Sequence, residues 1–378
     1  MGVPVIVGIY EIARRTIPDL RLIDVFEEAA RGAMIDAGLA ANDIDGLFVS
    51  NLPGVAPAFT LAQHLGIEPR WSDTTRIGGA APIAHVMHAA AAIRAGRVRA
   101  ALIVYGSLSR SQRIEIGTGE LMREAGAAEQ EWVGATITSR YAMFARRHMH
   151  DYGTTLEQLA APTVASRRWA QLNADAIRRE PTSIDDVLRS RIVATPLTAA
   201  MCCVISDGGG AVIVADAAVA TDASTRPVQI LGAGEQMAHG GDRQDRTHSA
   251  VRSAAQAAFG EAGVGPNEMD LCTVYDSFTI TVIAALEDAG FCAKGDGGQF
   301  VEDGRLGPGG ALPTNPDGGG LSANHPGMRG IFLVIELVRQ LRQEAGDRQV
   351  ADARLGVAIG VGGTLDDRHA SSVLVLGR

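Results

Sequence analysis

The chain of 378 residues is poor in lysine, because arginine supplies nearly all of its positive side chains and Lys294 is its one lysine. An enzyme that forms a Schiff base with a carbonyl substrate needs a lysine amine as nucleophile. Lys294 lies in a glycine-rich stretch, residues 293–298, that predicts a surface loop. The sequence therefore disfavours Schiff-base chemistry.

Cysteine, long apolar runs and net positive charge are scarce as well. The four cysteines show neither metal-ligand spacing nor a disulfide framework, and reduced thiols are typical of a cytoplasmic protein. No apolar run approaches the length that spans a bilayer, and the N-terminus lacks a basic-then-apolar signal pattern. The formal charge of -9 disfavours a nucleic-acid partner. We expect a cytoplasmic protein that binds neither membrane nor nucleic acid, with free cysteines at Cys202, Cys203, Cys272 and Cys292.

Histidine spacing does not favour a metal site. His148 and His150 are two residues apart on an expected helix and so face different ways, whereas His85 and His88 can share a face. Histidines on such helices are more often hydrogen-bonded structural groups than ligands. We expect no bound metal.

Two stretches share one frame, at residues 37–49 and 262–274, with a constant offset of 225 positions. Each copy has the pattern of an alanine-rich helix end, a polar turn and an apolar strand. Such a repeat predicts an ancient duplication and two intimately packed halves. We place the halves at residues 1–222 and 223–378.

Strand-length apolar runs alternate with helical patterns in both halves. This alternation favours an α/β protein with largely parallel sheets covered by helices. Between residues 107 and 197 the sequence becomes rich in arginine and polar helix, which predicts an insertion lying over the core as a cap. Strands are expected at 3–9, 45–49, 98–105, 228–231, 271–274 and 355–359, and helices at 22–37, 81–95, 249–262 and 330–343.

Four glycine-marked loops are the expected location of the chemistry. The second contains Tyr275-Asp276-Ser277-Phe278, the third Asn324-His325-Pro326-Gly327, and the fourth Gly360-Val361-Gly362-Gly363. In chain order the loops cover residues 74–81, 274–279, 318–327 and 359–364.

These motifs, in this order and within duplicated halves, resemble the thiolase superfamily over essentially the whole chain. The most similar branch is the sterol-carrier-protein-type, lipid-transfer group, which includes steroid side-chain-cleaving aldolases. The resemblance implies an α/β thiolase fold. Its duplicated βαβαβ-type halves would carry mixed sheets covered by helices in five layers, plus a helical cap insertion.

The sequence departs from the thiolase pattern at the catalytic positions. In thiolases the first loop carries a nucleophilic cysteine, and that position aligns with Gly79. The second catalytic cysteine aligns with Gly360, and the second loop begins with Tyr275 where Asn or His is usual. Only the histidine of the third loop is kept, as His325. Glycine cannot form an acyl-enzyme, so thiolysis is not expected.

The resemblance leaves a pocket that holds an acyl-CoA and stabilises an enolate at the thioester oxygen. The backbone amides of Gly79 and Gly362 resemble the oxyanion donors of the family. Retro-aldol cleavage of a 3-hydroxyacyl-CoA needs a base for the β-hydroxyl and a proton for the α-carbon. Tyr275 and His325 have suitable chemistry at family catalytic positions, and which of them takes the first proton stays open.

Two further residues are candidates in these loops, and each candidate has a structural alternative. Asp276 can orient Tyr275 or His325, or merely cap a turn. Asn324 replaces a glycine that is usual in the family and can contact substrate or water. A tyrosine that ends a strand commonly packs with its hydroxyl at the surface, and the candidate glycines can be plain turn residues.

The favoured hypothesis is a carbon–carbon lyase that cleaves a 3-hydroxyacyl-CoA to acetyl- or propionyl-CoA and a ketone or aldehyde. Bulky substrates such as steroid side-chain thioesters fit the branch. An acyltransferase or condensing enzyme and a non-catalytic acyl-CoA-binding subunit are the alternatives. No cofactor is expected beyond the coenzyme A of the substrate. The resemblance also implies a homodimer through a core sheet edge, and a small OB-fold, zinc-ribbon partner that completes a heterotetramer.

Overall fold

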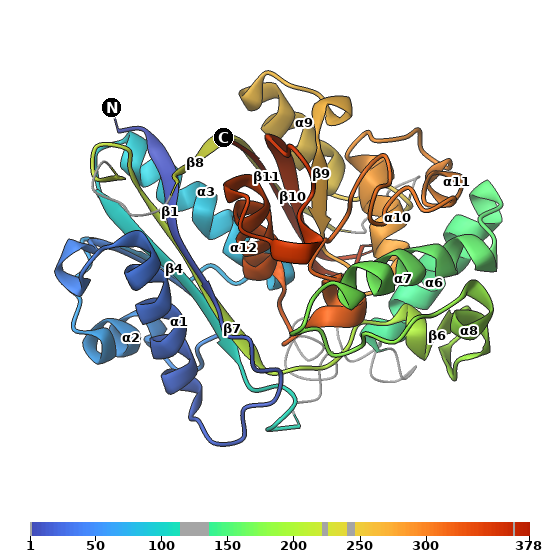
Figure 1. Cartoon of the computed structure of the whole chain (residues 1–378), viewed down its shortest axis with the longest axis horizontal. Helices are drawn as coiled ribbons and strands as arrows, with labels where there is room; N and C mark the ends of the chain where they lie inside the picture. Colours follow the sequence, from blue (N-terminus) through green and yellow to red (C-terminus); the bar gives the residue numbers. More distant parts are fainter. Residues whose placement is uncertain (1, 114–135, 221–225, 240–245, 366) are drawn as a thin grey trace.

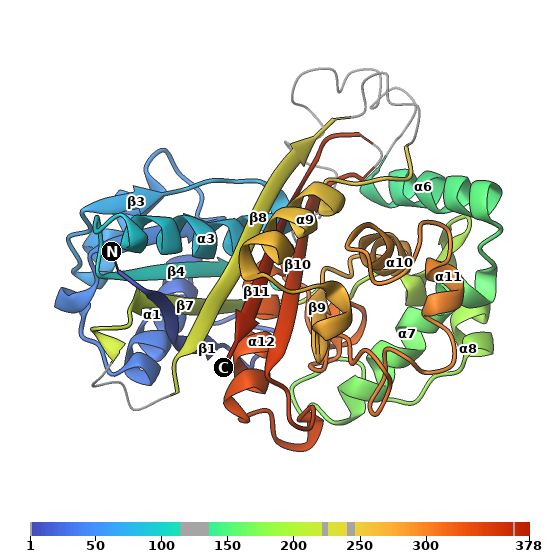
Figure 2. The same cartoon turned by 90° about the horizontal axis from the view of Figure 1, so that it is seen from above.

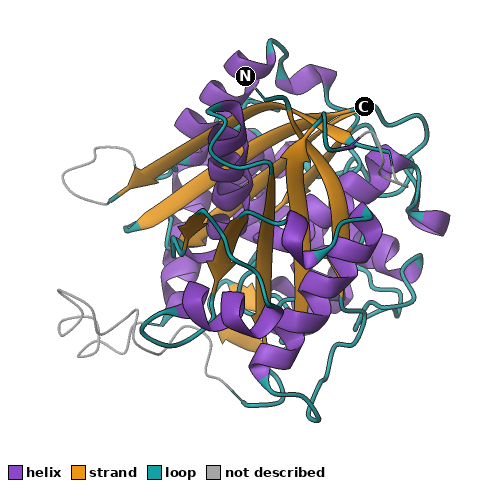
Figure 3. Ribbon diagram, turned by 90° about the vertical axis from the view of Figure 1, so that its left-hand side faces the viewer, coloured by secondary structure: helices purple, strands orange, loops and turns teal. Residues whose placement is uncertain are grey.

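One mixed sheet of nine strands forms the centre of the molecule (Figure 3). The computed structural model describes residues 2–113, 136–220, 226–239, 246–365 and 367–378. In these residues the strand order is β3-β2-β4-β7-β1-β8-β11-β10-β9, and β1 joins the two halves by pairing with β8. The strands are β1 (Pro4–Glu11), β2 (Gly46–Ser50), β3 (Trp71–Asp73), β4 (Ala100–Ser107), β7 (Gly208–Asp216), β8 (Val228–Ala238), β9 (Leu271–Val274), β10 (Leu355–Gly363) and β11 (His369–Gly377).

Helices cover the sheet in layers (Figure 1). The outer helix α1 (Leu22–Ala37) packs on β1, β4 and β7, with α2 (Pro57–Leu65) beside it. On the opposite outer side, α9 (Val251–Ala262) packs on β8 and β11, and α10 (Thr279–Asp288) packs on α9. Between the two halves lie α3 (Ala81–Arg94) and α12 (Gly330–Arg342), which contact each other and strands of both halves. The five layers expected from the resemblance are thereby confirmed.

The central position of α12 explains its sequence. Residues 330–338 are all buried, so this helix is apolar on nearly every side, as a helix enclosed by protein must be. The outer helix α1 instead has one buried face and one exposed face. All ten segments that were expected to be strand or helix overlap an element of that type.

The expectation of largely parallel sheets was wrong. Parallel pairing joins β2 with β3 and β4, and β9 with β10, whereas all other neighbours in the sheet are antiparallel. The alternation of strands and helices did not predict β11. Because only residues 364–368 connect β10 to β11, no crossover helix fits there and the two strands must run antiparallel.

The duplicated frame has the same hydrogen bonds in both halves. Gly38 ends α1 and Gly263 ends α9, each with a φ of 67°, a left-handed conformation that glycine adopts without strain. The Asp45 carboxylate accepts the amides of Arg99 and Ala100, and the Asp270 carboxylate accepts those of Arg354 and Leu355. The repeat therefore preserves a fold unit. The proposed boundary at 222/223 lies outside the described residues.

The segment between residues 107 and 197 forms helices that pack on the C-terminal half (Figure 2). Its residues 114–135 lie outside the described part. The helix α7 contacts α10 and the π-helical turn η6 (Gly319–Ala323), which precedes His325. The described elements of this cap are α6 (Ile137–Tyr152), α7 (Leu156–Gln171), α8 (Ile184–Arg189), β5 (Ile192–Ala194) and β6 (Leu197–Thr198).

Residues 293–296 form a loop that is exposed at Ala293 and Asp296, as predicted, but the Lys294 side chain within it is mostly buried. Its ammonium lies 3.1 Å from both the Glu287 and Asp288 carboxylates and donates to the Thr247 carbonyl at 2.5 Å. Both carboxylates are fully buried at the end of α10, so a cation beside them is required. His148, also buried, contacts Glu287, whereas His150 is exposed, as the spacing predicted.

A charged cluster links the two halves and makes stability depend on pH. His88 on α3 contacts Asp73 of β3 at 2.7 Å and Glu235 of β8 at 3.3 Å. These carboxylates, Asp73 first, raise the pKa of His88 to about 9. Because the folded-state pKa is raised, the contribution to stability is fully present below the unfolded pKa of about 6.5. It is lost as the pH rises from there through about 9.

We therefore expect His88→Gln to lower the free energy of unfolding by about 1–2 kcal/mol more at pH 6 than at pH 9.5, after allowance for solvent screening. Urea unfolding of both proteins at the two pH values measures the difference. An equal cost at both pH values would show that the charge of His88 contributes nothing.

Candidate active site

Tyr275 and His325 form a hydrogen-bonded pair at the junction of the second and third loops. The Tyr275 hydroxyl lies 3.0 Å from Nε2 of His325, and the two rings meet edge to face at 77° with centroids 5.5 Å apart. Tyr275 follows the last residue of β9, and His325 follows η6. Their exposed fractions are 6% and 2%, so the strand end and the turn bring them together in a largely water-free place.

Both members of the pair are neutral near pH 7. Burial raises the pKa of Tyr275 well above its usual value. Burial, and then the charge of Arg329, lowers the pKa of His325 to about 3. Nδ1 of His325 has no hydrogen-bond partner among the described residues, so Nε2 is the ring nitrogen that meets Tyr275. When Nε2 carries the proton, His325 donates to Tyr275 and Tyr275 donates to the Gly327 carbonyl at 3.3 Å; in the other tautomer Tyr275 donates to Nε2.

The ring of Tyr275 fills the space next to Gly79. A Cβ on Gly79 would lie 2.1 Å from Cε2 and 2.4 Å from Cζ of Tyr275, and 2.6 Å from the Val361 carbonyl. Gly79 is the position to which the resemblance assigns the thiolase nucleophile. A side chain at residue 79 and the observed place of Tyr275 therefore exclude each other, which is a physical reason for the missing cysteine.

The first and fourth loops touch through their backbones beside this ring. A Cβ on Gly362 would lie 1.8 Å from the Ile77 carbonyl, and one on Gly78 would lie 2.8 Å from Cα of Gly362. The close approach requires glycine at Gly362. Gly79 and Gly362 thus belong to one junction. Their role as oxyanion donors stays a prediction.

Asp276 and Asn324 support the third loop. The Asp276 carboxylate accepts the amides of Gly320 at 2.7 Å and Leu321 at 3.1 Å, and burial raises its pKa against the opposing effect of Arg329. The Asn324 side chain donates to Glu11 at 2.9 Å. Within the described part of the chain, neither side chain hydrogen-bonds to Tyr275 or to the His325 ring. Contact of either one with substrate remains a prediction.

Three residues that sequence reasoning missed also contact the pair or its loops. Ser206 accepts the His325 amide at 3.0 Å, and the Cys203 amide donates to the Ser277 carbonyl at 2.9 Å. Burial raises the pKa of the Cys203 thiol, so it stays protonated. Tyr105, on β4, fixes the turn after His325. No local motif marks these residues, because each lies at least 70 positions away in the chain from the loop that it contacts.

Tyr105 is a fully buried tyrosine whose hydroxyl has two backbone partners. It donates to the Pro326 carbonyl at 2.5 Å and accepts the Met328 amide at 2.9 Å. These two residues flank Gly327, whose carbonyl accepts Tyr275. The N-terminal half thus holds the turn that follows His325 in the C-terminal half.

Removing that hydroxyl is expected to loosen the turn. Tyr105→Phe leaves the part-buried Met328 amide without its partner and the buried Pro326 carbonyl without its shorter hydrogen bond, at a cost of about 1–3 kcal/mol in the free energy of unfolding. Ser109→Ala is the matched control, because Ser109 reaches the same carbonyl only at 3.3 Å. Chemical denaturation of the three proteins measures the effect. Equal losses in both variants would contradict the role of Tyr105.

Two other features of the described residues lie away from the pair. A surface hollow of about 590 Å³ is lined by residues 41–45 and by Gly66, Glu68, Arg70, Arg99 and Val219. Asp24, Glu27 and His64 place ligand atoms close together, but Asp24 pairs with Arg21, and Glu27 pairs with Arg31 and His64. Neither feature includes a residue of the four loops. Among the described helices, none has the length and apolarity to cross a bilayer.

Comparisons with known proteins agree with this geometry. Residues 232–378 match the family model described as "Thiolase C-terminal domain-like". The chain is 35% identical to an acetyl-CoA acetyltransferase of Methanothermobacter thermautotrophicus, over 95% of this chain and 96% of the relative. It is 33% identical to a steroid side-chain-cleaving aldolase of Thermomonospora curvata, over 82% of this chain and 84% of the relative.

A solved structure, the Ltp2-ChsH2(DUF35) aldolase, superposes with a TM-score of 0.89 at 29% identity, covering 100% of this chain and 98% of that one. Both sequence relatives exceed 30% identity over most of their length, and the structural match spans all the layers described above. On these grounds the chain belongs to the thiolase superfamily.

Proposed function

We propose that this protein is a carbon–carbon lyase that cleaves a 3-hydroxyacyl-CoA by a retro-aldol reaction without an acyl-enzyme. The observation that carries the proposal is the neutral Tyr275–His325 pair, with the Tyr275 ring over a glycine where the family has its nucleophile. The similarity to proteins named as aldolases supports it. Steroid side-chain thioesters are the substrate class that we favour.

The reaction needs only proton movement at this pair. The β-hydroxyl of the substrate gives its proton to the Tyr275–His325 pair, and the Cα–Cβ bond breaks as the β-carbon becomes a carbonyl. The electron pair passes to the thioester as an enolate, for which the amides of Gly79 and Gly362 are the expected donors. The α-carbon then takes the proton back, which releases acetyl- or propionyl-CoA. The pair ends in its starting protonation state.

A panel of 3-hydroxyacyl-CoAs tests the proposal. We expect a short acyl-CoA and a ketone or aldehyde in equal amounts, detected by mass spectrometry, with no added coenzyme A. If no member of the panel, steroid thioesters included, yields such products in the presence of any partner subunit, the proposal is wrong.

An acyltransferase or condensing enzyme is the second candidate, favoured by the similarity to an acetyl-CoA acetyltransferase over 95% of this chain. That activity would require coenzyme A or a second acyl-CoA as co-substrate. Cleavage of a 3-ketoacyl-CoA that depends on added coenzyme A distinguishes it from the lyase. A non-catalytic acyl-CoA-binding subunit would show neither activity.

We also propose that the protein works as a homodimer together with a small OB-fold, zinc-ribbon subunit, in the cytoplasm. β3 is an edge strand of the sheet, and it carries the exposed Trp71. Two more exposed apolar side chains, Val55 and Phe59, lie just before α2 and within it. The structural relative named above has a second component, ChsH2(DUF35), in its own name. Light scattering measures the assembly state. Equal activity with and without a co-encoded partner would contradict the need for that subunit.

A further inference from the structure

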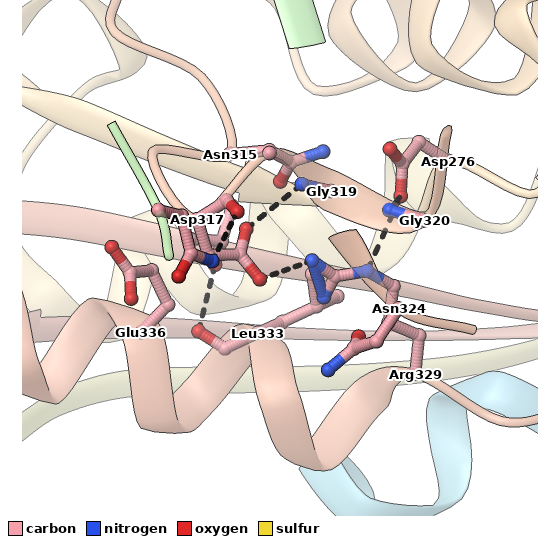
Figure 4. Close-up of polar contacts among 12 residues, drawn as sticks. Asp276, Asn315, Asp317, Gly319, Gly320, Asn324, Arg329, Leu333 and Glu336 are labelled. Carbon is pink, nitrogen blue, oxygen red and sulfur yellow. Dashed lines mark hydrogen bonds and ion pairs between the residues drawn. The ribbon is translucent and has the colours of Figure 1, made fainter. Parts of the chain in front are cut away.

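Arg329 is an arginine with no exposed surface, placed at the N-cap of α12 (Figure 4). The dipole of a helix disfavours a cation at its N-terminus, and burial of a charge is costly without partners. Its partners are two carboxylates. Nη2 contacts Asp317, and Nε lies 3.6 Å from Oδ1 of Asp276. Arg329 is therefore held by one carboxylate next to Tyr275 and by another that precedes the turn leading to His325.

The two carboxylates fix three successive amides of the third loop. Asp317 accepts the Gly319 amide at 3.0 Å, while Asp276 accepts those of Gly320 and Leu321. Figure 4 shows Asp317 between Gly319 and Arg329. One guanidinium thus secures both anchors of the turn that leads to His325.

The side chains of Arg329 and His325 both pack against Gly320. A Cβ on Gly320 would lie 2.9 Å from Asp276 Oδ1, 3.1 Å from His325 Cδ2 and 3.2 Å from Arg329 Cδ. The His325 ring, the Asp276 carboxylate and the Arg329 side chain therefore pack around one backbone position. A charge on Arg329 acts on the imidazole through protein, not through water.

The groups around His325 come from several elements, and most of them are neutral. Tyr275 follows β9, Tyr105 lies on β4, and Cys203 lies before β7. Burial raises the pKa of both tyrosine hydroxyls and of the Cys203 thiol. Asp276 and Arg329 carry the nearby formal charges, and burial raises the pKa of Asp276. Arginine remains charged in proteins. Nε and Nη1 of Arg329 have no hydrogen-bond partner within the part of the chain that the structure describes.

We propose that Arg329 is the positioning residue of the Tyr275–His325 pair: it braces the glycine turn that carries His325 and places a fixed positive charge beside the imidazole. The catalytic consequence rests on the lyase function proposed above, whereas the effect on His325 itself does not. Arg329 acts through the loop and through its charge.

The remainder of the buried network provides a matched control. Arg348 pairs with Glu336 at 3.0 Å, and Arg339 pairs with Glu11 at 3.0 Å and with Glu336 at 3.6 Å. Arg348→Gln removes one charge from the same network, but this arginine contacts neither Asp276 nor Asp317 by any ion pair of the described residues. It reports the general cost of unbalancing the network.

Nuclear magnetic resonance of the histidine ring, assigned by comparison with His325→Gln, tests the inference in the full-length protein. In Arg329→Gln we expect the His325 pKa to rise by about one to three units, because a nearby positive charge has been removed. Arg329→Lys and Arg348→Gln should leave it within about half a unit of the wild-type value. An unchanged His325 titration in Arg329→Gln would overturn the inference.

If Arg329→Gln does not fold, the charge-balanced double variant Arg329→Gln with Asp317→Asn replaces it, with the same expected direction. In the activity assay of Arg329→Gln, the acid limb of the pH–rate profile should move to higher pH. The kcat should fall about 10- to 100-fold, and KM should change less than about twofold. A wild-type protein that cleaves no 3-hydroxyacyl-CoA would refute the proposed function and leave the titration result standing.

Discussion

Tyr275→Phe is expected to lower kcat for carbon–carbon cleavage by about 10²- to 10⁴-fold, the usual contribution of a general acid–base group. The substitution removes one oxygen and keeps the ring that fills the space over Gly79. Packing should therefore survive, and the melting temperature should change little. His325 would lose its 3.0 Å partner, and the β-hydroxyl proton could no longer pass through the Tyr275 oxygen.

Steady-state kinetics with the best member of the 3-hydroxyacyl-CoA panel measures this effect. Tyr10→Phe is the matched control, because Tyr10 lies on β1 and packs over Gly32, away from the four loops. We expect the control to retain activity within about twofold. Full activity of Tyr275→Phe would remove Tyr275 from the mechanism and with it the main support for the lyase.

Restoring a side chain at Gly79 is expected to destroy the site, and not to recover thiolase chemistry. In Gly79→Cys or Gly79→Ala the new Cβ overlaps the Tyr275 ring and approaches the Val361 carbonyl. The ring must move, which separates it from His325. We expect a loss of about 1–3 kcal/mol in the free energy of unfolding from overpacking, together with a loss of activity of about 100-fold or more.

Chemical denaturation and kinetics of these variants measure both effects. Gly260→Ala is the control, because Gly260 lies in α9 with nothing within 4 Å of the position of its added Cβ; it should be neutral or slightly stabilising. In a Tyr275→Ala background the cost of Gly79→Ala should shrink, because the overlap with the Tyr275 ring is gone while the contact with the Val361 carbonyl remains. Coenzyme A-dependent thiolysis by Gly79→Cys would show that the space is free after all.

The sequence alone predicted the architecture well, since its signals are local. The duplicated frame, with its helix-ending glycines Gly38 and Gly263, and the apolar runs of strand length each report a backbone preference. β11 and the antiparallel pairing of β7 were missed because they depend on which strands lie side by side. Antiparallel placement depends on the length of a connection and on the neighbouring strands, not on composition.

The candidate site was only partly predictable. Resemblance placed Tyr275 and His325 in loops that do meet, but it did not show that the tyrosine ring excludes a side chain at Gly79. The supporting groups are long-range, as with Tyr105 and Pro326, which are 221 positions apart. Arg329 carried one local signal, a cation where a helix begins. The loop around Lys294 was predicted, but glycine-rich sequence does not reveal the two buried carboxylates that its ammonium contacts.

The Tyr275–His325 pair is proposed to break a carbon–carbon bond in the place where thiolases form a covalent acyl-enzyme. Intact-protein mass spectrometry of the enzyme quenched during turnover of a cleaved 3-hydroxyacyl-CoA tests it most directly. The account predicts that the mass of the chain stays unchanged while acyl-CoA product accumulates. An acyl adduct that appears during turnover, on any side chain, and decays as product forms would contradict it.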